Sequence, residues 1–389
     1  MKFNKWTLGL AAVGAISLTS AARADEPKLS PLNVAESDTT ISGVVDIGAE
    51  YATGNVHNDY YSSESSAASY YNYGLNGGLD NFSVSQVLIS LDKPLDASSW
   101  ASGYHIDLNW GTSAVMPLNS TYDYGYYSNE NPLRQAYVTM RTPVGSGITW
   151  KAGLFDNILG YESNTLVSNP NYSHSYGWNV EPTSQLGLIG TYNIADWVSV
   201  TAGLANTYYQ YSVSDKTYLG AVTFTAPDSF GWAKGAALTL GVNQGFYKYA
   251  QNNYYAGLTL PTPISALKVG LAFDLVGNIN EYPNNNPQDD SEWIVGAYAS
   301  YQATDKLSVN VRGEYNNGYG YPYDNGIREE VTITTAYNLW ANVTSRVELR
   351  WDHADEGTPL GYPGYDSSGA YDGARSDDFT IAFNVAYTF

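Results

Sequence analysis

The stretch 378–389 alternates strictly between two kinds of side chain. Large apolar residues take every second position: Phe379, Ile381, Phe383, Val385, Tyr387 and Phe389. Side chains of a β-strand point alternately to its two faces, so this pattern predicts a strand with one apolar face and one small, polar face. Its length of roughly ten residues suits one tilted crossing of a bilayer's hydrocarbon core. An amphipathic strand of a soluble β-sandwich would look the same, so the rest of the chain has to decide.

The remainder of the chain repeats this pattern. In the run 266–277, Leu271 and Phe273 oppose Lys268 and Asp274. Such alternation of apolar and polar residues predicts half-buried strands. The predicted strands, about sixteen in number, cover 41–52, 83–93, 101–111, 133–143, 147–156, 185–195, 197–211, 217–227, 235–248, 253–262, 266–277, 292–303, 306–316, 329–340, 343–353 and 378–389.

The connections between these strands alternate in length as well. The long ones follow odd-numbered strands, at about 53–82, 112–132, 157–184, 279–291, 317–328 and 354–377. The short ones include 144–146, 195–196, 263–265, 304–305 and 341–342. A membrane barrel places short turns on the periplasmic side and long loops outside, whereas a sandwich has no reason for this asymmetry. The sequence therefore predicts an all-β fold, a transmembrane antiparallel up-and-down β-barrel of about 16 strands over 41–389, with short periplasmic turns and long extracellular loops.

The N-terminus has the features of an export signal. Two lysines precede an apolar run that ends near Leu18, and a small-x-small cleavage site closes at Ala24. We therefore expect a signal peptide over 1–24, followed by a polar periplasmic lead-in over 25–40. Its removal takes away three basic residues and leaves 15 against 38 acidic ones, a net charge of −23 in place of −20. This charge argues against nucleic acid as a partner.

Four segments carry a family resemblance: NPLRQAYV (131–138), ITWKAGLF (148–155), GYES (160–163) and YSHSYG (172–177). They resemble the OmpL-like family of outer-membrane β-barrel porins, most densely over about 131–195. A strand that closes on an aromatic, here Phe389, also resembles the C-terminal signature of bacterial outer-membrane barrels. The resemblance implies a porin-like barrel in the outer membrane of a Gram-negative bacterium, and it says little about the solute.

A barrel of about sixteen strands is wide enough for an aqueous channel. An Arg or Lys facing lipid costs roughly 2–4 kcal/mol at the bilayer midplane, so charged strand residues are expected to face inward. The predicted pore-lining residues are Asp46, Glu50, His105, Asp107, Arg141, Lys151, Lys268, Asp274, Arg312, Glu314, Arg346, Glu348, Arg350 and Asp352. Two interpretations stay open. Opposed charges create a field that filters solutes, or they pair along and across strands and keep the lumen wet.

The third long connection, about 157–184, is rich in Asn and aromatic residues. In sixteen-stranded general porins the third loop folds inward and narrows the pore, and by that analogy this segment is expected to form a constriction. The predicted constriction residues are Asn169, Asn171, Tyr172, His174, Tyr176 and Trp178. The alternative is an ordinary surface loop.

Nothing in the sequence predicts catalysis, a metal site or a cofactor. The chain has 4 histidines and no cysteine, and no two histidines have helical metal-ligand spacing. His174 and Ser175 are adjacent, so on a strand they would point to opposite faces and could not act together as in a hydrolase, whereas in a loop they could. Acidic loops such as 284–292 offer oxygen ligands for calcium, and tyrosine-rich loops could stack on sugars. Solvated loops and a self-packing rim are the alternatives.

These observations predict an outer-membrane porin that lets small hydrophilic solutes or ions cross the lipid bilayer by passive diffusion, filtered by size and charge at a loop constriction. The negative net charge favours a mild preference for cations, although loop charges are screened beyond about 8–10 Å at physiological salt. A homotrimer is expected only by analogy with sixteen-stranded porins. The alternative is a non-conducting barrel that acts through its extracellular loops as a surface-binding or adhesion module.

Overall fold

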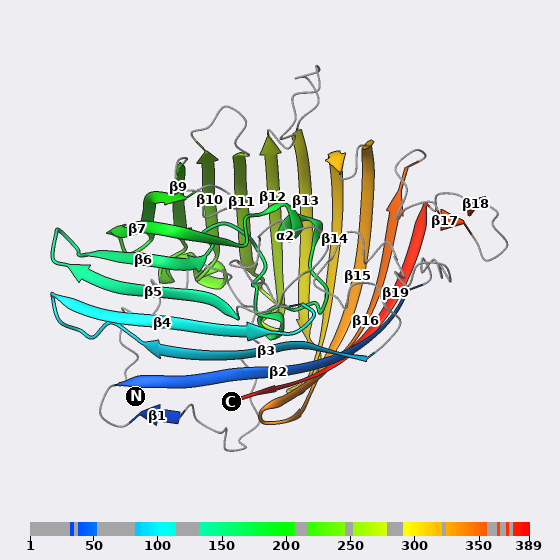
Figure 1. Ribbon diagram of the computed structural model, residues 1–389, viewed down its shortest axis with the longest axis horizontal. Helices are drawn as coiled ribbons and strands as arrows, with labels where there is room; N and C mark the ends of the chain where they lie inside the picture. Colours follow the sequence, from blue (N-terminus) through cyan, green and yellow to red (C-terminus); the bar gives the residue numbers. More distant parts are fainter. Residues whose placement is uncertain are drawn as a thin grey trace.

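Sixteen antiparallel strands form one closed barrel (Figure 1). The computed structural model describes residues 32–34, 38–52, 82–113, 132–206, 216–245, 252–277, 291–320, 324–355, 364–365, 371–372 and 376–389. The barrel closes where the last strand pairs with the first, and Phe383 lies opposite Ala49 at this seam. The predicted fold is therefore confirmed. The predicted signal peptide, most of the lead-in and most of the long loops lie outside the described residues and stay predictions.

The strands agree with the predicted ranges to within a few residues at most ends. Those of the barrel are β2 (Thr39–Ala52), β3 (Phe82–Lys93), β4 (Ala101–Trp110), β5 (Leu133–Thr142), β6 (Ile148–Asp156), β7 (Ser184–Ala195), β8 (Val198–Asn206), β9 (Lys216–Thr225), β10 (Ala237–Gly245), β11 (Asn252–Pro261), β12 (Leu267–Gly277), β13 (Ser291–Gln302), β14 (Leu307–Gly320), β15 (Asp324–Trp340), β16 (Val343–Ala354) and β19 (Asp377–Thr388). Each pairs with its neighbours along the chain, as an up-and-down barrel requires.

A few short elements complete the described structure. Strand β1 (Leu32–Val34) pairs with the start of β2, and β17 (Gly364–Tyr365) pairs with β18 (Tyr371–Asp372). The helical pieces are η2 (Leu166–Ser168), α2 (Tyr176–Val180) and η3 (Asp228–Ala233). None of the helices in the described ranges is long and apolar enough to cross a membrane.

The two faces of each strand meet different surroundings. In β19, Phe379 is 56% exposed whereas its neighbour Thr380 is 4% exposed. The same contrast recurs in β16, where Leu349 is exposed and Arg350 is buried. Exposed apolar residues on the outside of a closed barrel match the lipid-facing band of a transmembrane barrel, and polar residues face the lumen. Exposed tryptophans at the short-turn end, Trp100, Trp197 and Trp340, match an interfacial belt.

The prediction of a long loop over 317–328 is wrong. Strands β14 and β15 continue as a paired ladder up to Gly320 opposite Asp324, so only 321–323 lie between them. The Asn-Asn-Gly sequence at 316–318 is a common turn signal. Here it lies inside the ladder because Asn316 and Asn317 keep their pairing with β13 and β15 on both sides. Strand pairing outweighed the local preference.

Candidate functional site: an internal loop and the cavity beside it

The segment between β6 and β7, residues 157–183, lies inside the barrel (Figure 1). It contains η2 and α2, and its side chains reach strands far away in sequence. The hydroxyl of Tyr172 lies 2.6 Å from Ser85 Oγ in β3. The hydroxyl of Tyr176 donates to Asp352 Oδ1 in β16 at 2.7 Å. We call this segment the internal loop. The segment therefore folds into the lumen, and its role as a constriction stays a prediction.

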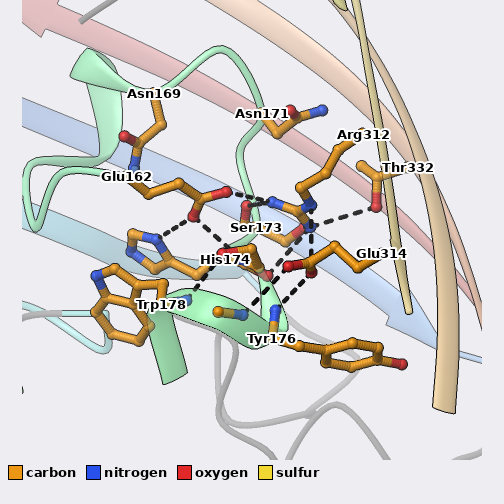
Figure 2. A network of polar contacts seen from close by, with 12 residues as sticks. Glu162, Asn169, Asn171, Ser173, His174, Tyr176, Trp178, Arg312, Glu314 and Thr332 are labelled. Carbon is orange, nitrogen blue, oxygen red and sulfur yellow. Dashed lines mark hydrogen bonds and ion pairs between the residues drawn. The ribbon is translucent and has the colours of Figure 1, made fainter. Parts of the chain in front are cut away.

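Arg312 of β14 is the centre of the contact between the wall and the internal loop (Figure 2). Its side chain has no exposed surface. Nη1 donates to Glu162 Oε1 at 2.9 Å and to the carbonyl of Ser173 at 2.7 Å, and Nη2 donates to the carbonyl of His174 at 3.1 Å. Nε donates to Glu330 Oε1 in β15 at 2.7 Å. The guanidinium therefore ties two strands of the wall to the loop.

Two arginines of β16 hold further loop carbonyls. Arg346 donates to the carbonyls of Leu166 and Asn171 at 3.2 and 3.1 Å. Arg350 donates to the carbonyl of His174 at 2.7 Å and pairs with Asp352 at 2.8 Å. A guanidinium carries several donors in a fixed fork, so one side chain can satisfy several buried carbonyls at once.

Two glutamates of the same wall accept the loop's amide hydrogens. Glu348 accepts from the backbone N–H of Tyr172 at 2.6 Å and from that of Ser173 at 2.9 Å. Glu314 accepts from the N–H of Tyr176 at 2.6 Å and from that of Gly177 at 3.2 Å (Figure 2). Wall arginines thus bind carbonyls and wall glutamates bind amides. The loop backbone, which would otherwise be buried without partners, has its hydrogen bonds met by the barrel.

Glycines in the wall make room for loop tyrosines. A Cβ atom on Gly48 of β2 would lie 2.1 Å from the hydroxyl oxygen of Tyr172, and one on Gly270 of β12 would lie 1.7 Å from that of Tyr161. Both distances are far below van der Waals contact. Any side chain at either position would displace the tyrosine, so these two glycines act as sockets for the loop.

Burial and pairing set the charges within the loop. Burial disfavours the ionised form of Glu162, but Arg312, His174 and the N–H of Ser175 outweigh it and hold its pKa at about 2. Burial lowers the pKa of His174 although Glu162, 2.9 Å from Nδ1, raises it. Burial and then the carboxyl of Asp274 raise the pKa of Glu181 well above its usual value. Glu162 is therefore ionised at neutral pH, while burial favours the neutral form of His174 and the protonated form of Glu181.

A cavity of about 480 Å³ remains between the internal loop and the wall formed by β3 to β6. The wall contributes Lys93, His105, Tyr137 and Lys151, among others. The loop side includes Asn164, Trp178 and Glu181. Trp178 is rigidly placed, because its ring stacks on His174 at 3.7 Å and its Nε1 donates to Asn164 at 2.9 Å.

The predicted pore-lining residues divide into several groups. Those of β14 and β16 face inward but are covered by the internal loop: Arg312, Glu314, Arg346, Glu348, Arg350 and Asp352. Three others are also inward and buried: Asp46, Glu50 and Asp274. Only His105 and Lys151 of the predicted set border the cavity. Asp107 is buried beside them, 3.0 Å from His105 Nε2. Lys268 is half-buried on the inner face, and Arg141 bonds to backbone carbonyls near a turn.

The pairing interpretation describes several of these charges. Arg350 pairs with Asp352 along one strand, and Arg312 pairs with Glu330 across two. Neither interpretation included the internal loop, which is the main partner of these charged side chains. Of the predicted constriction residues, Trp178 borders the cavity, whereas Asn169, Asn171, Tyr172, His174 and Tyr176 are buried against the wall or within the loop.

Sequence reasoning missed several residues that fix the site. Arg134 of β5 bonds to Asp156 and donates to Thr165 at 2.9 Å. Gln86 of β3 donates to the carbonyl of Asn164 and accepts from the N–H of Leu166, both at 3.0 Å. Their positions in alternating strands show which face they occupy, but no local pattern identifies the loop atoms they bind.

Residues 38–389 match the family described as Putative beta-barrel porin-2, OmpL-like. No curated protein matches the chain. Among solved structures, the outer membrane channel DcaP of Acinetobacter baumannii gives a TM-score of 0.56 at 13% identity, covering 93% of this chain and 100% of that one. The anion-selective porin from Comamonas acidovorans gives 0.56 at 11% identity, with 90% and 99% covered. OmpT of Vibrio cholerae lacking loop L8 gives a TM-score of 0.53 at 13% identity, covering 90% of this chain and 99% of that one. At these identities the likeness shows the fold alone.

Proposed function

This chain belongs to the OmpL-like porin family of the bacterial outer membrane, and from that premise we propose that it passes small hydrophilic solutes by diffusion along the inner face of β3 to β6. The observation that carries the proposal is the cavity of about 480 Å³ beside the internal loop. Elsewhere the loop is in contact with the wall, from β14 and β16 to β2 and β3. The path is therefore off-centre, and the internal loop forms one side of its constriction.

The filter combines size with charge. A space of this volume suits one small molecule, which is the usual scale of a ligand-sized cavity. The chain's net charge of −20 favours small cations at the mouths of the pore, and this preference is part of the proposal. Its reach is limited to about 8–10 Å at physiological salt, so groups at the constriction act more strongly than the loops. No chemical step is involved.

A non-conducting barrel that works through its outer loops is the second candidate. The observation that favours it is the extent to which the internal loop fills the lumen, leaving Arg312, Glu348 and Asn384 with almost no exposed surface. A filled barrel conducts nothing, so one measurement separates the two candidates. Export with cleavage after Ala24, and assembly as a homotrimer, belong to the same proposal. Mass spectrometry of the mature chain and cross-linking in membranes test them.

The test is single-channel current through the signal-free protein refolded into a planar bilayer. Stepwise ohmic current would support an off-centre constricted pore if only neutral polymers of small hydrated radius enter it. A reversal potential of cationic sign in a salt gradient would support the charge preference. A correctly folded, heat-modifiable barrel that gives no current would refute the porin proposal and leave the loop-based one.

A further inference from the structure

We propose that the cavity contains a subsite for small organic anions, in which the ammonium group of Lys151 binds a carboxylate and Trp178 contacts an apolar, planar body. This inference rests on the proposed function, because it names the solute class that the same constriction retains. It starts from charges that remain after the pairing within the site is taken into account.

Three of the four carboxyl groups that line the cavity already have cationic or hydrogen-bonding partners, and burial raises the pKa of the fourth, Glu181. Asp156 is bound by Arg134, and Glu162 is bound by Arg312 at 2.9 Å. Asp92 lies 3.0 Å from His105 Nδ1. Because each of these carboxylates is engaged, none is left as a strong, free site for a cationic solute.

Lys151 is in the opposite situation. Among the residues that the structure describes, no carboxylate forms an ion pair with its ammonium group. Nζ lies 4.4 Å from the ring centroid of Tyr137 and 5.7 Å from that of Phe155. Cation–π contacts orient the ammonium group without neutralising its charge. Lys93 lines the same cavity and likewise has no ion-pair partner in the described ranges.

The cavity is apolar enough to favour an organic anion over an inorganic one. Tyr137 lies on the wall side, while Leu159, Trp178 and Pro182 lie on the loop side. One face of Trp178 is taken by His174, with an interplanar angle of 6°, and the residue still borders the cavity. A rigid indole loses little entropy when a flat ligand contacts it. A small number of charged and polar groups beside apolar and aromatic walls is the usual composition of a small-molecule site.

This subsite is compatible with a mild preference for small cations in bulk current. The net charge of −20 acts on mobile ions over roughly a Debye length. Lys151 acts at contact distance on a molecule that has already entered the cavity. Bulk selectivity and retention of one solute class are therefore separate quantities, and separate measurements report them.

The experiment uses three probes of similar size and different charge: benzoate, benzamide and benzylammonium. Binding to the folded, full-length mature chain in detergent is measured by calorimetry, and block of single-channel current is measured in parallel. We expect benzoate to bind about tenfold or more tightly than benzamide, the scale of one hydrogen bond to a charged group. Benzylammonium is expected to bind more weakly than benzamide.

Variants assign the effect to one side chain. Lys151→Met keeps the apolar stem and should abolish the advantage of benzoate over benzamide, whereas Lys151→Arg should keep most of it. Lys234→Met is the matched control, because Lys234 is exposed in a turn and paired with Asp228 at 3.0 Å. If Lys151→Met does not fold, as judged by heat-modifiable mobility, Lys151→Gln replaces it.

The outcomes separate this inference from the proposed function. Steady current with equal binding of benzoate and benzamide would overturn the subsite and leave the porin intact. Selective benzoate binding without any current would support the subsite and refute the porin. Selectivity for benzoate that survives in both Lys151→Met and Lys151→Gln would also overturn the assignment, since the charge would then come from elsewhere.

Discussion

Arg312→Met is expected to release the internal loop without opening the barrel. Arg312 belongs to a strand whose ladder with β13 and β15 is made by backbone groups, and the substitution leaves these in place. What is lost is the side chain's contact with the loop. The variant should therefore fold as a barrel, remain heat-modifiable, and carry more current than the wild type because the loop no longer stays against the β14–β16 wall.

The size of the effect follows from the bonds removed. Arg312 makes five hydrogen bonds of 3.1 Å or shorter, and four of them go to loop atoms in Glu162, Ser173 and His174. Without it, Glu162 and Glu330 lose the guanidinium that pairs with both. Removing one partner from a buried ion pair typically costs roughly 3–5 kcal/mol. The equilibrium between docked and released loop would then shift by roughly 10²–10⁴-fold, at the lower end if water reaches Glu162.

Single-channel recording and limited proteolysis together measure this change. Conductance should rise or flicker between two levels, and protease should cut within the internal loop of Arg312→Met but not of the wild type. Arg141→Gln is the control, since it removes another inward arginine whose hydrogen bonds go to the carbonyls of Asp96 and Ser98 instead. If Arg312→Met matches both the wild type and Arg141→Gln in conductance and in protease resistance, the arginine does not anchor the loop and the reasoning fails.

Three further predictions concern the same loop. Gly270→Val should expel Tyr161 from its socket and raise conductance, while Gly277→Val, where nothing lies within 4 Å of the added Cβ, should not; equal conductance in the two variants would count against the socket. Glu181→Gln should raise the melting temperature more at pH 8 than at pH 5. Burial and Asp274 raise the pKa of Glu181 above its usual 4.5, so docking of the internal loop in the wild type weakens as pH rises. An equal gain in melting temperature at both pH values would contradict this. Glu162, with a pKa of about 2, should stabilise docking of the internal loop above about pH 4.5 and lose that contribution as pH falls towards about 2. Conductance should therefore rise in acid, and Glu162→Gln should lack this acid-dependent rise.

The strands could be predicted because their signal is local. Leu271 and Phe273 lie two residues apart, and both point to lipid because a closed barrel keeps the alternation of each strand. Neighbouring strands are also neighbours in sequence, so the order of the alternating segments along the chain predicts the order of the strands around the barrel. The error at 317–328 has the same origin, since Asn316-Asn-Gly is a local turn signal that pairing with β13 and β15 overrode.

The destination of the internal loop could not be derived in this way. Its hydrogen bonds with β14 to β16 join residues that are 137 to 180 positions apart, such as Tyr176 with Glu314 and Leu166 with Arg346. Periodicity shows that Arg346 and Glu314 face inward, but not whether they meet water or a loop. The inward fold came from analogy with other porins, and the sockets at Gly48 and Gly270 had no sequence signal beyond a high glycine content.

This distinction changes how charge should be interpreted in such a barrel. The sequence places many charges of both signs on the inner face, and their number alone allows either a strong field across the lumen or pairing between them. In the structure, Arg312, Arg346 and Arg350 are neutralised or hydrogen-bonded by the loop and by neighbouring acids. A charge that is already paired contributes little to a passing solute, so the few unpaired groups at the cavity, Lys151 first among them, should outweigh the net charge of −20 at the constriction.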